Sequence, residues 1–470
     1  MTSANRIEKD SLGEHALPGD ALYGINTFRG VQNFPIAGRT LGECTPLVKS
    51  LAQVKQAAAL ANRDIGALDE ERADAIIQAC QRMIAGHYNA DLRCDLLEGS
   101  GGTSLNMNAN EVLTNAALGL LGCQSGDYTC LHPNDHLNLS QSTNDVVSTA
   151  IKLAVFEVTE SLINQLSWLA DALSAKRNEF ADVLRLGRTC LQDAQPMTLG
   201  QAFGGYESVV RRHREQLQHR CRDLLSVPLG GTAIGTGLGA RRGYRDVVCR
   251  YLAELVGQDV TSEANTFDGM QNMDSCARLS AELRNTGNSL WKLGNDLIIL
   301  SSGPAGGLGE LILPAVQAGS SIMPGKINPV IPMTACQVSL AVHGNDAAVS
   351  LAAQQGLLDL NHYEIVIVDR LLDSVSMLDG AVATLTENCI VDLRANEERS
   401  LANLMNSGAL ATVLIPMLGY GRVTELVKEA DQKNRRFVDL IIASGYLDEA
   451  QITQALREAA LSPEHMTSMA

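Results

Sequence analysis

Residues 319–330, GSSIMPGKINPV, place two hydroxyls, one ammonium and one amide within nine positions. Two glycines and two prolines in the same stretch exclude a regular helix or strand there. Hydroxyls and amides donate hydrogen bonds without charge, whereas a lysine adds one positive charge. The segment therefore predicts a loop that binds an oxygen-rich anion.

Three further segments, at 98–111, 132–145 and 187–193, interrupt the apolar pattern with dense polar side chains. Neutral donors can fix the geometry of a small anion, and one cation sets its charge preference. No carboxylate dyad, catalytic Ser-His-Asp order or metal cluster competes with this inventory, and we expect no metal and no cofactor. The candidate binding residues are Thr103, Ser142, Thr143, Asn144, Thr189, Ser320, Ser321, Lys326 and Asn328.

Some of these residues have simpler interpretations. The run Ser142 to Asp145 could serve only as the N-cap of the helix that follows it. His132 and His136 could be surface histidines, since a histidine pair without Cys or Glu at ligand spacing makes a poor metal site. The glycine-rich run 230–239 lacks the spacing of a phosphate-binding loop, so a structural turn is favoured there.

Composition narrows the class of protein. The 470 residues carry a formal charge of −16, which argues against nucleic-acid and membrane-surface partners. Eleven cysteines, an odd number without a C-x-x-C pair, indicate a reduced, cytoplasmic setting. Residues 1–15 lack the apolar core of a signal peptide, and no apolar run is long enough to span a bilayer.

Helical periodicity dominates the chain between its loops. Low aromatic content, with Leu and Ala as the main apolar residues, favours helix over sheet. Residues 1–40 read as loop and short strand, and the last seventy as short helices with a possible hinge at 419–421. Five long helices suggest an elongated bundle whose spare apolar stripes pack on other copies of the chain. Helices are predicted at 45–63, 68–88, 145–180, 199–226, 271–300, 329–355 and 357–387.

Taken together, the polar segments resemble those of the aspartase/fumarase superfamily, and within it the aspartate ammonia-lyases most closely. GSSIMPGKINP is similar to the superfamily signature. The other matching segments, in the same order as in the family, are DALYGINTFRG, NMNANEV, HPND, SQSTND, GRTCLQDAQPMTLGQ and GTAIGTGL. The match covers nearly the whole chain.

The resemblance implies a mainly α, three-domain fold with a central long-helix bundle. Its expected domains are an N-terminal one (1–141), a central bundle that forms the tetramer core (142–396) and a small C-terminal one (397–470). It also implies a homotetramer in which three subunits share each active site, and a small dicarboxylate substrate.

The family eliminates an amine or water from a succinate skeleton to give fumarate. By resemblance, Ser320 is the base that removes the proton, and Lys326 and Asn328 bind one carboxylate. The other carboxylate is bound by Thr103, Ser142, Thr143 and Ser321. Asn144, Thr189 and Cys190 face the leaving group, and His132 with Asn134 resembles a second anion site of fumarases.

Three positions depart from the family pattern. Cys190 stands where relatives have His or Gln, Met333 where they have Glu, and Ala305 where they have Arg. The departures are either neutral substitutions in an enzyme that still acts as an aspartase, or they mark a changed leaving-group pocket. The alternatives are a paralogous lyase that releases another amine or nucleophile, a fumarate hydratase, which is disfavoured without a basic relay, and a catalytically inactive structural member.

Overall fold

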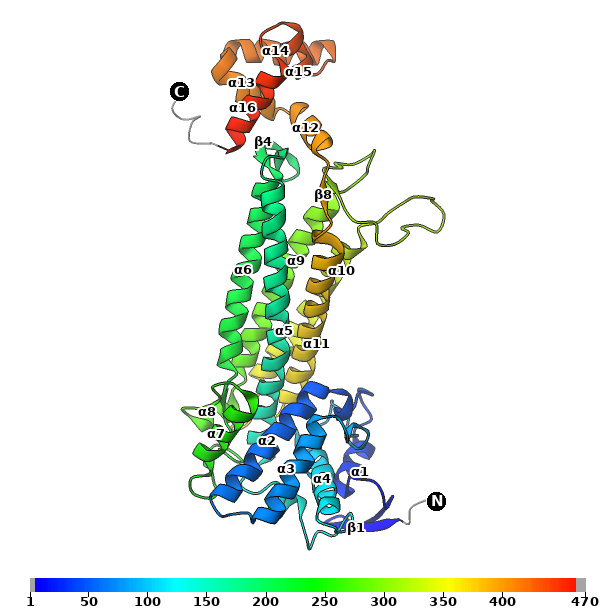
Figure 1. Cartoon of the computed structure of the whole chain (residues 1–470), viewed down its shortest axis with the longest axis vertical. Coiled ribbons are helices and arrows are strands. Elements are labelled where there is room, and N and C mark those ends of the chain that lie inside the picture. Colours follow the sequence, from blue (N-terminus) through cyan, green and yellow to red (C-terminus); the bar gives the residue numbers. More distant parts are fainter. Residues whose placement is uncertain (1–4, 462–470) are drawn as a thin grey trace. The chain divides into compact units, whose positions relative to one another are not determined.

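A computed structural model describes residues 5–461 of the chain (Figure 1). The predicted ends of the terminal domains, 1–4 and 462–470, lie outside the described residues. The five predicted long helices are confirmed, and most of their ends agree within three residues. The last begins seven residues later than predicted, because Leu358 adopts a positive φ of 53° in a turn after Gly356. These helices are α5 (Thr143–Glu179), α6 (Leu199–Asp223), α9 (Asp274–Leu300), α10 (Val330–Gln354) and α11 (Glu364–Leu385).

The chain divides into two compact units, and each is built from separate stretches of sequence. The first unit comprises the described parts of Met1–Ile163, Glu215–Arg284 and Ala341–Met377. The second comprises those of Asn164–Arg214, Asn285–Leu340 and Leu378–Ala470. The three-domain division at 142 and 397 stays a prediction.

In the first unit, α2 packs against α3 and α7, and α4 packs against α1 and α3. The alanine-rich face of α2 is almost wholly buried, which allows its neighbours to approach closely. The helices of this unit outside the bundle are α1 (Ile25–Asn33), α2 (Thr45–Asp64), α3 (Glu70–Ile84), α4 (Thr103–Leu120), α7 (Tyr244–Val256) and α8 (Thr266–Gln271), with short turns η1 (Leu41–Glu43), η2 (Asn89–Asp91) and η3 (Pro133–Leu137). Its strand pairs are antiparallel β1 (Arg6–Asp10) with β2 (Gly13–Leu17) and parallel β5 (Ser226–Val227) with β6 (Thr261–Ser262).

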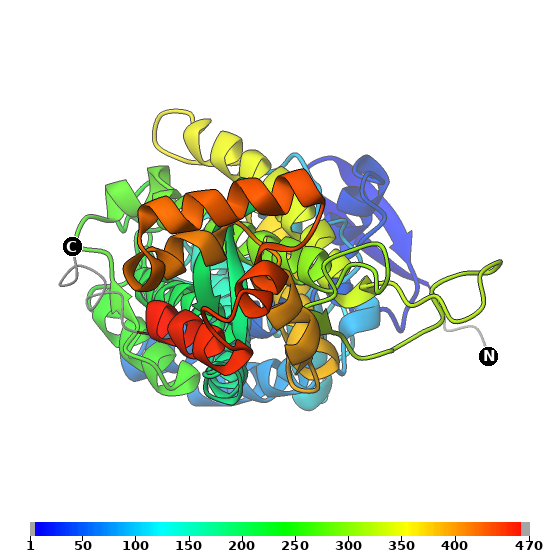
Figure 2. The ribbon, with the colours of Figure 1, turned by 90° about the horizontal axis from the view of Figure 1, so that it is seen from above.

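In the second unit, short helices cover a β-hairpin. Figure 2 shows α13 to α16, in orange and red, gathered over the green hairpin of β3 and β4. Leu184 and Leu186 of β3 enter the same apolar core as Leu410 and Leu414 of α13. The elements are β3 (Leu184–Thr189), β4 (Gln192–Thr198), β7 (Leu311–Ile312), β8 (Arg394–Ala395), η4 (Thr386–Ile390), α12 (Glu397–Met405), α13 (Ala409–Leu418), α14 (Tyr420–Lys433), α15 (Phe437–Ala443) and α16 (Glu449–Leu461).

Two polar segments that were expected to lie between helices are regular structure. Helix α4 begins at Thr103 and runs through most of the 98–111 segment. The sequence did not reveal it because buried polar residues, among them Asn106 and Glu111, lie between its buried apolar residues, such as Leu105 and Val112. The 187–193 segment is the turn and inner part of the β3–β4 hairpin. Helix α1 was also missed in a region expected to be loop and strand.

The expected hinge coincides with a helix boundary. Gly419, with φ of 79°, separates α13 from α14, a conformation that glycine adopts without strain. Across residues 5–461 no single helix is long and apolar enough to cross a bilayer; only the bent pair of α12 and α13, counted together, reaches that apolarity.

Candidate active site

The 319–328 segment is a closed loop in the long connection from α9 to α10, which Figure 1 shows standing away from the helices. At its neck the Gly319 N–H donates to the Lys326 carbonyl at 2.7 Å, and the Asn328 side-chain amide donates to the Gly319 carbonyl at 2.6 Å. A Cβ at position 319 would lie 2.6 Å from the Lys326 carbonyl oxygen. Only glycine allows the two ends of the loop to approach this closely.

The predicted base, Ser320, sits just inside this neck. Its Oγ accepts the backbone N–H groups of Ile322 at 3.2 Å and Met323 at 3.0 Å. Donors directed at a hydroxyl oxygen stabilise its deprotonated form. Ser321 and Lys326 are exposed, and Ile322 at the loop tip is 84% exposed.

Thr189 and Cys190 lie at the tip of the β3–β4 hairpin. Cys190 and Leu191 form the two-residue turn, with positive φ angles of 52° and 60°. Such turns favour Asn and Gly because side chains strain this conformation. Strained residues persist where the surroundings hold them and gather at functional sites. The role of this tip stays a prediction.

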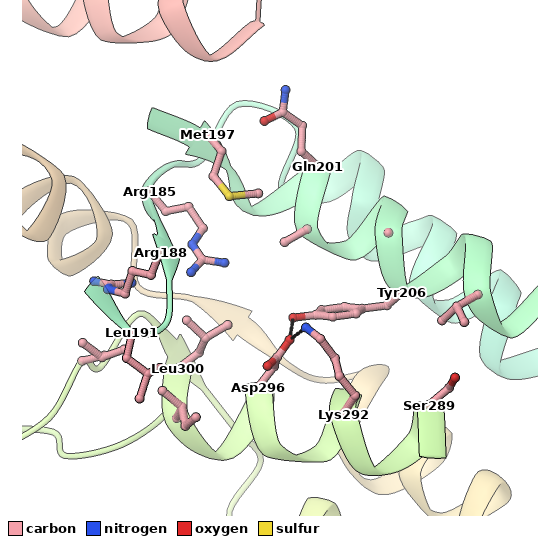
Figure 3. Close-up of a pocket in the computed structure, with 15 residues that line it drawn as sticks. Arg185, Arg188, Leu191, Met197, Gln201, Tyr206, Ser289, Lys292, Asp296 and Leu300 are labelled. Carbon is pink, nitrogen blue, oxygen red and sulfur yellow. Dashed lines mark hydrogen bonds and ion pairs between the residues drawn. The ribbon is translucent and has the colours of Figure 1, made fainter. Parts of the chain in front are cut away.

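Strand β3 of the hairpin is held by buried charges. Arg188 pairs with Glu310 at 2.7 Å, and Arg185 approaches the other oxygen of Glu310 at 3.4 Å. Glu310 is fully buried, and burial lowers the pKa of Arg185. A cavity of about 550 Å³ separates this hairpin from α6 and α9, where the Tyr206 hydroxyl donates to Asp296 at 2.6 Å (Figure 3).

In the first unit, Asp145 organises the predicted substrate residues next to it in sequence. Its fully buried carboxylate accepts the N–H groups of Ser142 at 2.9 Å and of Gly230 and Thr232 at 3.0 Å each. Burial raises the pKa of Asp145 to about 6. The glycine-rich 230–239 run thus supports the 140–145 loop, in line with its interpretation as a structural turn.

The predicted substrate residues beside Asp145 are fixed by further contacts. Asn144 donates from its side-chain amide to the Ala233 carbonyl at 2.7 Å, and Thr143 Oγ1 accepts from Asn106 at 3.1 Å. The Asn144 N–H donates to Ser142 Oγ at 3.4 Å, so part of the N-cap interpretation also holds. Each side chain remains half-buried, and a ligand could still reach them.

Lys55 is a buried lysine next to this loop that the sequence interpretation missed. Its Nζ donates to the side-chain oxygens of Asn138 at 2.8 Å and Gln141 at 3.0 Å. The side chain is fully buried, and burial lowers the pKa of Lys55 to about 7. A lysine inside the apolar run LAQVKQAAAL was the sequence signal for it.

Thr103 is the exposed first residue of α4. The Glu98 carboxylate stabilises the turn that precedes α4, because it accepts the N–H groups of Ser100 at 2.6 Å and Gly102 at 2.5 Å. Gly102 has a positive φ of 85°, and a Cβ there would lie 3.0 Å from the Val147 side chain on α5. The glycines of this segment therefore allow Thr103 to begin a helix close to α5.

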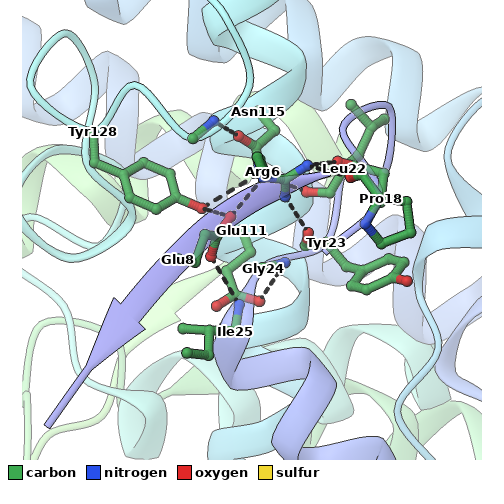
Figure 4. Close-up of polar contacts among 12 residues, drawn as sticks. Arg6, Glu8, Pro18, Leu22, Tyr23, Gly24, Ile25, Glu111, Asn115 and Tyr128 are labelled. Atoms are coloured by element: carbon green, nitrogen blue, oxygen red, sulfur yellow. Dashed lines mark hydrogen bonds and ion pairs between the residues drawn. The ribbon is translucent and has the colours of Figure 1, made fainter. Parts of the chain in front are cut away.

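Two buried carboxylates fasten α1 to α4 and β1 (Figure 4). Glu111 accepts the N–H groups of Gly24 and Asn26 at 2.8 Å each, and Glu8 accepts that of Ile25 at 2.9 Å. Both carboxylates lie at the positive end of α1, which stabilises negative charge, although burial raises the pKa of Glu111. Arg6 then pairs with Glu8 at 2.8 Å.

His132 has a structural role in η3. Its Nδ1 accepts the N–H groups of Asn134 at 3.1 Å and Asp135 at 3.3 Å. The second anion site at His132 and Asn134 stays a prediction. Within residues 5–461, no group of three or more His, Cys, Asp or Glu side chains is arranged to hold a metal ion.

The predicted site residues fall into two sets. The first unit holds Thr103, Ser142, Thr143 and Asn144. The second unit holds Thr189, Cys190, Ser320, Ser321, Lys326 and Asn328. Met333, 43% exposed, and Ala305 are also on the surface of the second unit, so neither departure is buried within one chain. The site assignment stays a prediction.

Comparison with known proteins identifies the family. A family model described as "Lyase" matches residues 13–344, and one described as "Fumarase C C-terminus" matches 410–468. The chain is 44% identical to an aspartate ammonia-lyase of Pseudomonas aeruginosa, over 97% of this chain and 96% of that protein. It is 39% identical to an aspartate ammonia-lyase of Bacillus subtilis, over 98% and 96%.

Solved structures agree. A fumarate lyase:delta crystallin from Brucella melitensis, bound to cobalt, matches with a TM-score of 0.92 and 42% identity, over 96% of this chain and 98% of that one. A class II fumarase from Schistosoma mansoni matches with a TM-score of 0.90 and 33% identity, over 98% and 100%. This chain therefore belongs to the aspartase/fumarase superfamily of lyases.

Proposed function

We propose that this protein is a carbon–nitrogen lyase that reversibly eliminates ammonia from L-aspartate to give fumarate. One observation supports this most strongly: relatives named aspartate ammonia-lyase are 39 to 44% identical to it over nearly the whole chain. The substrate class is a small dicarboxylate. The polar segments suit such an anion, because they supply many neutral donors and one exposed cation, Lys326.

The proposed chemistry begins with removal of a C–H proton by Ser320. The neighbouring carboxylate then gains charge and becomes a dianion-like aci form. Donors from Thr103, Ser142, Thr143 and Ser321 stabilise that charge, as in an oxyanion hole, where one donor contributes roughly 3 kcal/mol. Ammonia leaves from the adjacent carbon on the opposite face.

The remaining residues hold the two ends of the substrate. Lys326 and Asn328 bind the second carboxylate, and Asn328 uses one amide hydrogen to close the loop neck while keeping the other for substrate. Asn144, Thr189 and Cys190 face the leaving ammonium.

Ser320 needs help to act as a base, because a serine hydroxyl is a weak one in water. The two backbone N–H groups directed at its oxygen, from Ile322 and Met323, favour the alkoxide. A positive charge on Lys326, six residues away in the same closed loop, acts in the same direction. The loop closes over the substrate and excludes water, which strengthens both effects.

We place the two sets of residues in shared sites of a homotetramer, three subunits contributing to each. Support comes from large apolar side chains that one chain leaves exposed, among them Leu238 at 85%, Ile322 at 84% and Leu340 at 58%. We infer that other chains of the tetramer cover these side chains. Eleven cysteines without a disulfide among the described residues fit a cytoplasmic location.

A second candidate is a lyase that releases a different amine or nucleophile to give fumarate. The observation that favours it is the loss of basic and acidic groups on the leaving-group side, with Cys190 and Met333 in their places. Hydration of fumarate is disfavoured by the same loss, because activation of water requires a base.

The ultraviolet absorbance of fumarate distinguishes these functions. The purified protein should produce fumarate from L-aspartate and consume fumarate with ammonia, while fumarate alone yields negligible malate. Ser320→Ala, prepared identically, controls for contaminating host enzymes. Consumption of fumarate only with a substituted amine would establish the second candidate, and inertness toward every partner would leave an inactive structural member.

A further inference from the structure

Two cysteines outside the predicted site lie side by side in a short loop. Cys123 Sγ and Cys130 Sγ are 2.7 Å apart, and both side chains are half-buried and free. A disulfide bond is about 2.0 Å long, so the sulfurs need to approach by less than about 1 Å to form one. None of the proposed catalytic steps uses either thiol.

The backbone on both sides of the pair is already fixed. The Cys123 N–H donates to the Leu118 carbonyl at 2.9 Å, at the end of α4, and the Cys130 carbonyl accepts from Arg72 at 2.7 Å. Between them, the Gly126 N–H donates to Asn115 at 2.8 Å and the Tyr128 hydroxyl to Glu8 at 3.0 Å (Figure 4). A thiol held in this way attacks a mixed disulfide on its neighbour far faster than a free thiol does.

We propose that Cys123 and Cys130 form a reversible disulfide by exchange with a low-molecular-weight disulfide of the glutathione type. The thiolate of one cysteine attacks the small disulfide, releases one thiol and keeps the other half as a mixed disulfide. The other cysteine then loses its proton to solvent and attacks the first sulfur, which releases the second thiol. The pair loses two electrons, and the small disulfide is reduced to two thiols.

The disulfide closes a ring around a loop that contacts β1. The closed ring 123–130 contains Tyr128, which binds Glu8 of β1, and His132 follows the ring two residues later. Oxidation therefore restricts a loop that supports β1 and the predicted second anion site.

The sequence offers a direct test. Asp127 lies between the two cysteines, and cleavage before Asp95, Asp127 and Asp135 gives peptides 95–126 and 127–134, with one cysteine each. The folded full-length protein is equilibrated with oxidised and reduced glutathione, alkylated, and digested with a protease that cleaves before aspartate. We expect the two peptides to remain linked and to separate after reduction. The number of free thiols titrated in the denatured protein should fall from eleven to nine per chain.

Serine variants test the two steps. Cys130→Ser and Cys123→Ser should each trap one glutathione on the remaining cysteine, because the neighbouring thiol that would displace it is gone. Cys44→Ser, at another half-buried cysteine, should form the 123–130 link like wild type. Glutathione on both cysteines without a link, or a link that forms only after denaturation, would overturn the proposal.

Discussion

Asp145→Asn tests whether one buried carboxylate organises the 140–145 loop. Asp145 is fully buried and accepts three backbone N–H groups, from Ser142, Gly230 and Thr232. Burial raises its pKa from 3.8 to about 6. Protonation therefore favours the folded state, so the contribution of Asp145 to stability is greatest at low pH and is lost as the pH rises through 6.

The expected magnitude follows from these two pKa values. Between pH 6.5 and pH 4, a carboxyl with a pKa of about 6 folded and 3.8 unfolded gains about 2 kcal/mol of stability. The asparagine cannot titrate, so wild type should gain this amount relative to Asp145→Asn on acidification. Asp145→Ala should be less stable than Asp145→Asn at pH 6.5, because each buried N–H left without an acceptor costs about 1 kcal/mol or more.

Hydrogen exchange at the amides of Gly230 and Thr232 measures the local opening free energy without requiring two-state unfolding. After correction for intrinsic rates, the protection of wild type relative to Asp145→Asn should rise about 30-fold from pH 6.5 to pH 4. Asp259→Asn, at an exposed aspartate of the same unit, should follow wild type. If protection in Asp145→Asn stays within about 0.5 kcal/mol of wild type at both pH values, the role assigned to this carboxylate is wrong.

Three further predictions concern the proposed site. Ser320→Ala should lower kcat by orders of magnitude and leave substrate binding largely intact, whereas Lys326→Ala should also raise KM. Retained turnover in Ser320→Ala would mean that another group takes the proton. Inactive variants at Thr189 and at Ser320 should recover partial activity when denatured together and refolded, and a fully active monomer in sizing chromatography would exclude shared sites. Cys190→Gly should stabilise the hairpin by about 1 kcal/mol because it relieves a positive φ, and unchanged or lower protection of the β3–β4 amides in hydrogen exchange would argue against strain there.

The sequence by itself determined the helical framework and the residues of the 319–328 loop. Apolar residues at three- and four-residue steps define α5, α6, α9 and α10, because a long helix must bury one stripe. Glycine and proline mark the loop between α9 and α10, since both exclude regular structure. The same logic failed for α4, because its buried face mixes polar residues such as Asn106, Asn110 and Glu111 with the apolar ones.

Only the tertiary structure decided which polar groups meet. Asp145 binds N–H groups 85 and 87 residues away, and Glu111 caps a helix that begins more than eighty residues before it. The burial of Lys55 and the contact between Cys123 and Cys130 likewise depend on how the elements pack. Local sequence sets the conformation of a segment, but burial, pKa and hydrogen-bond partners depend on the neighbours that packing brings, and these come from distant parts of the chain.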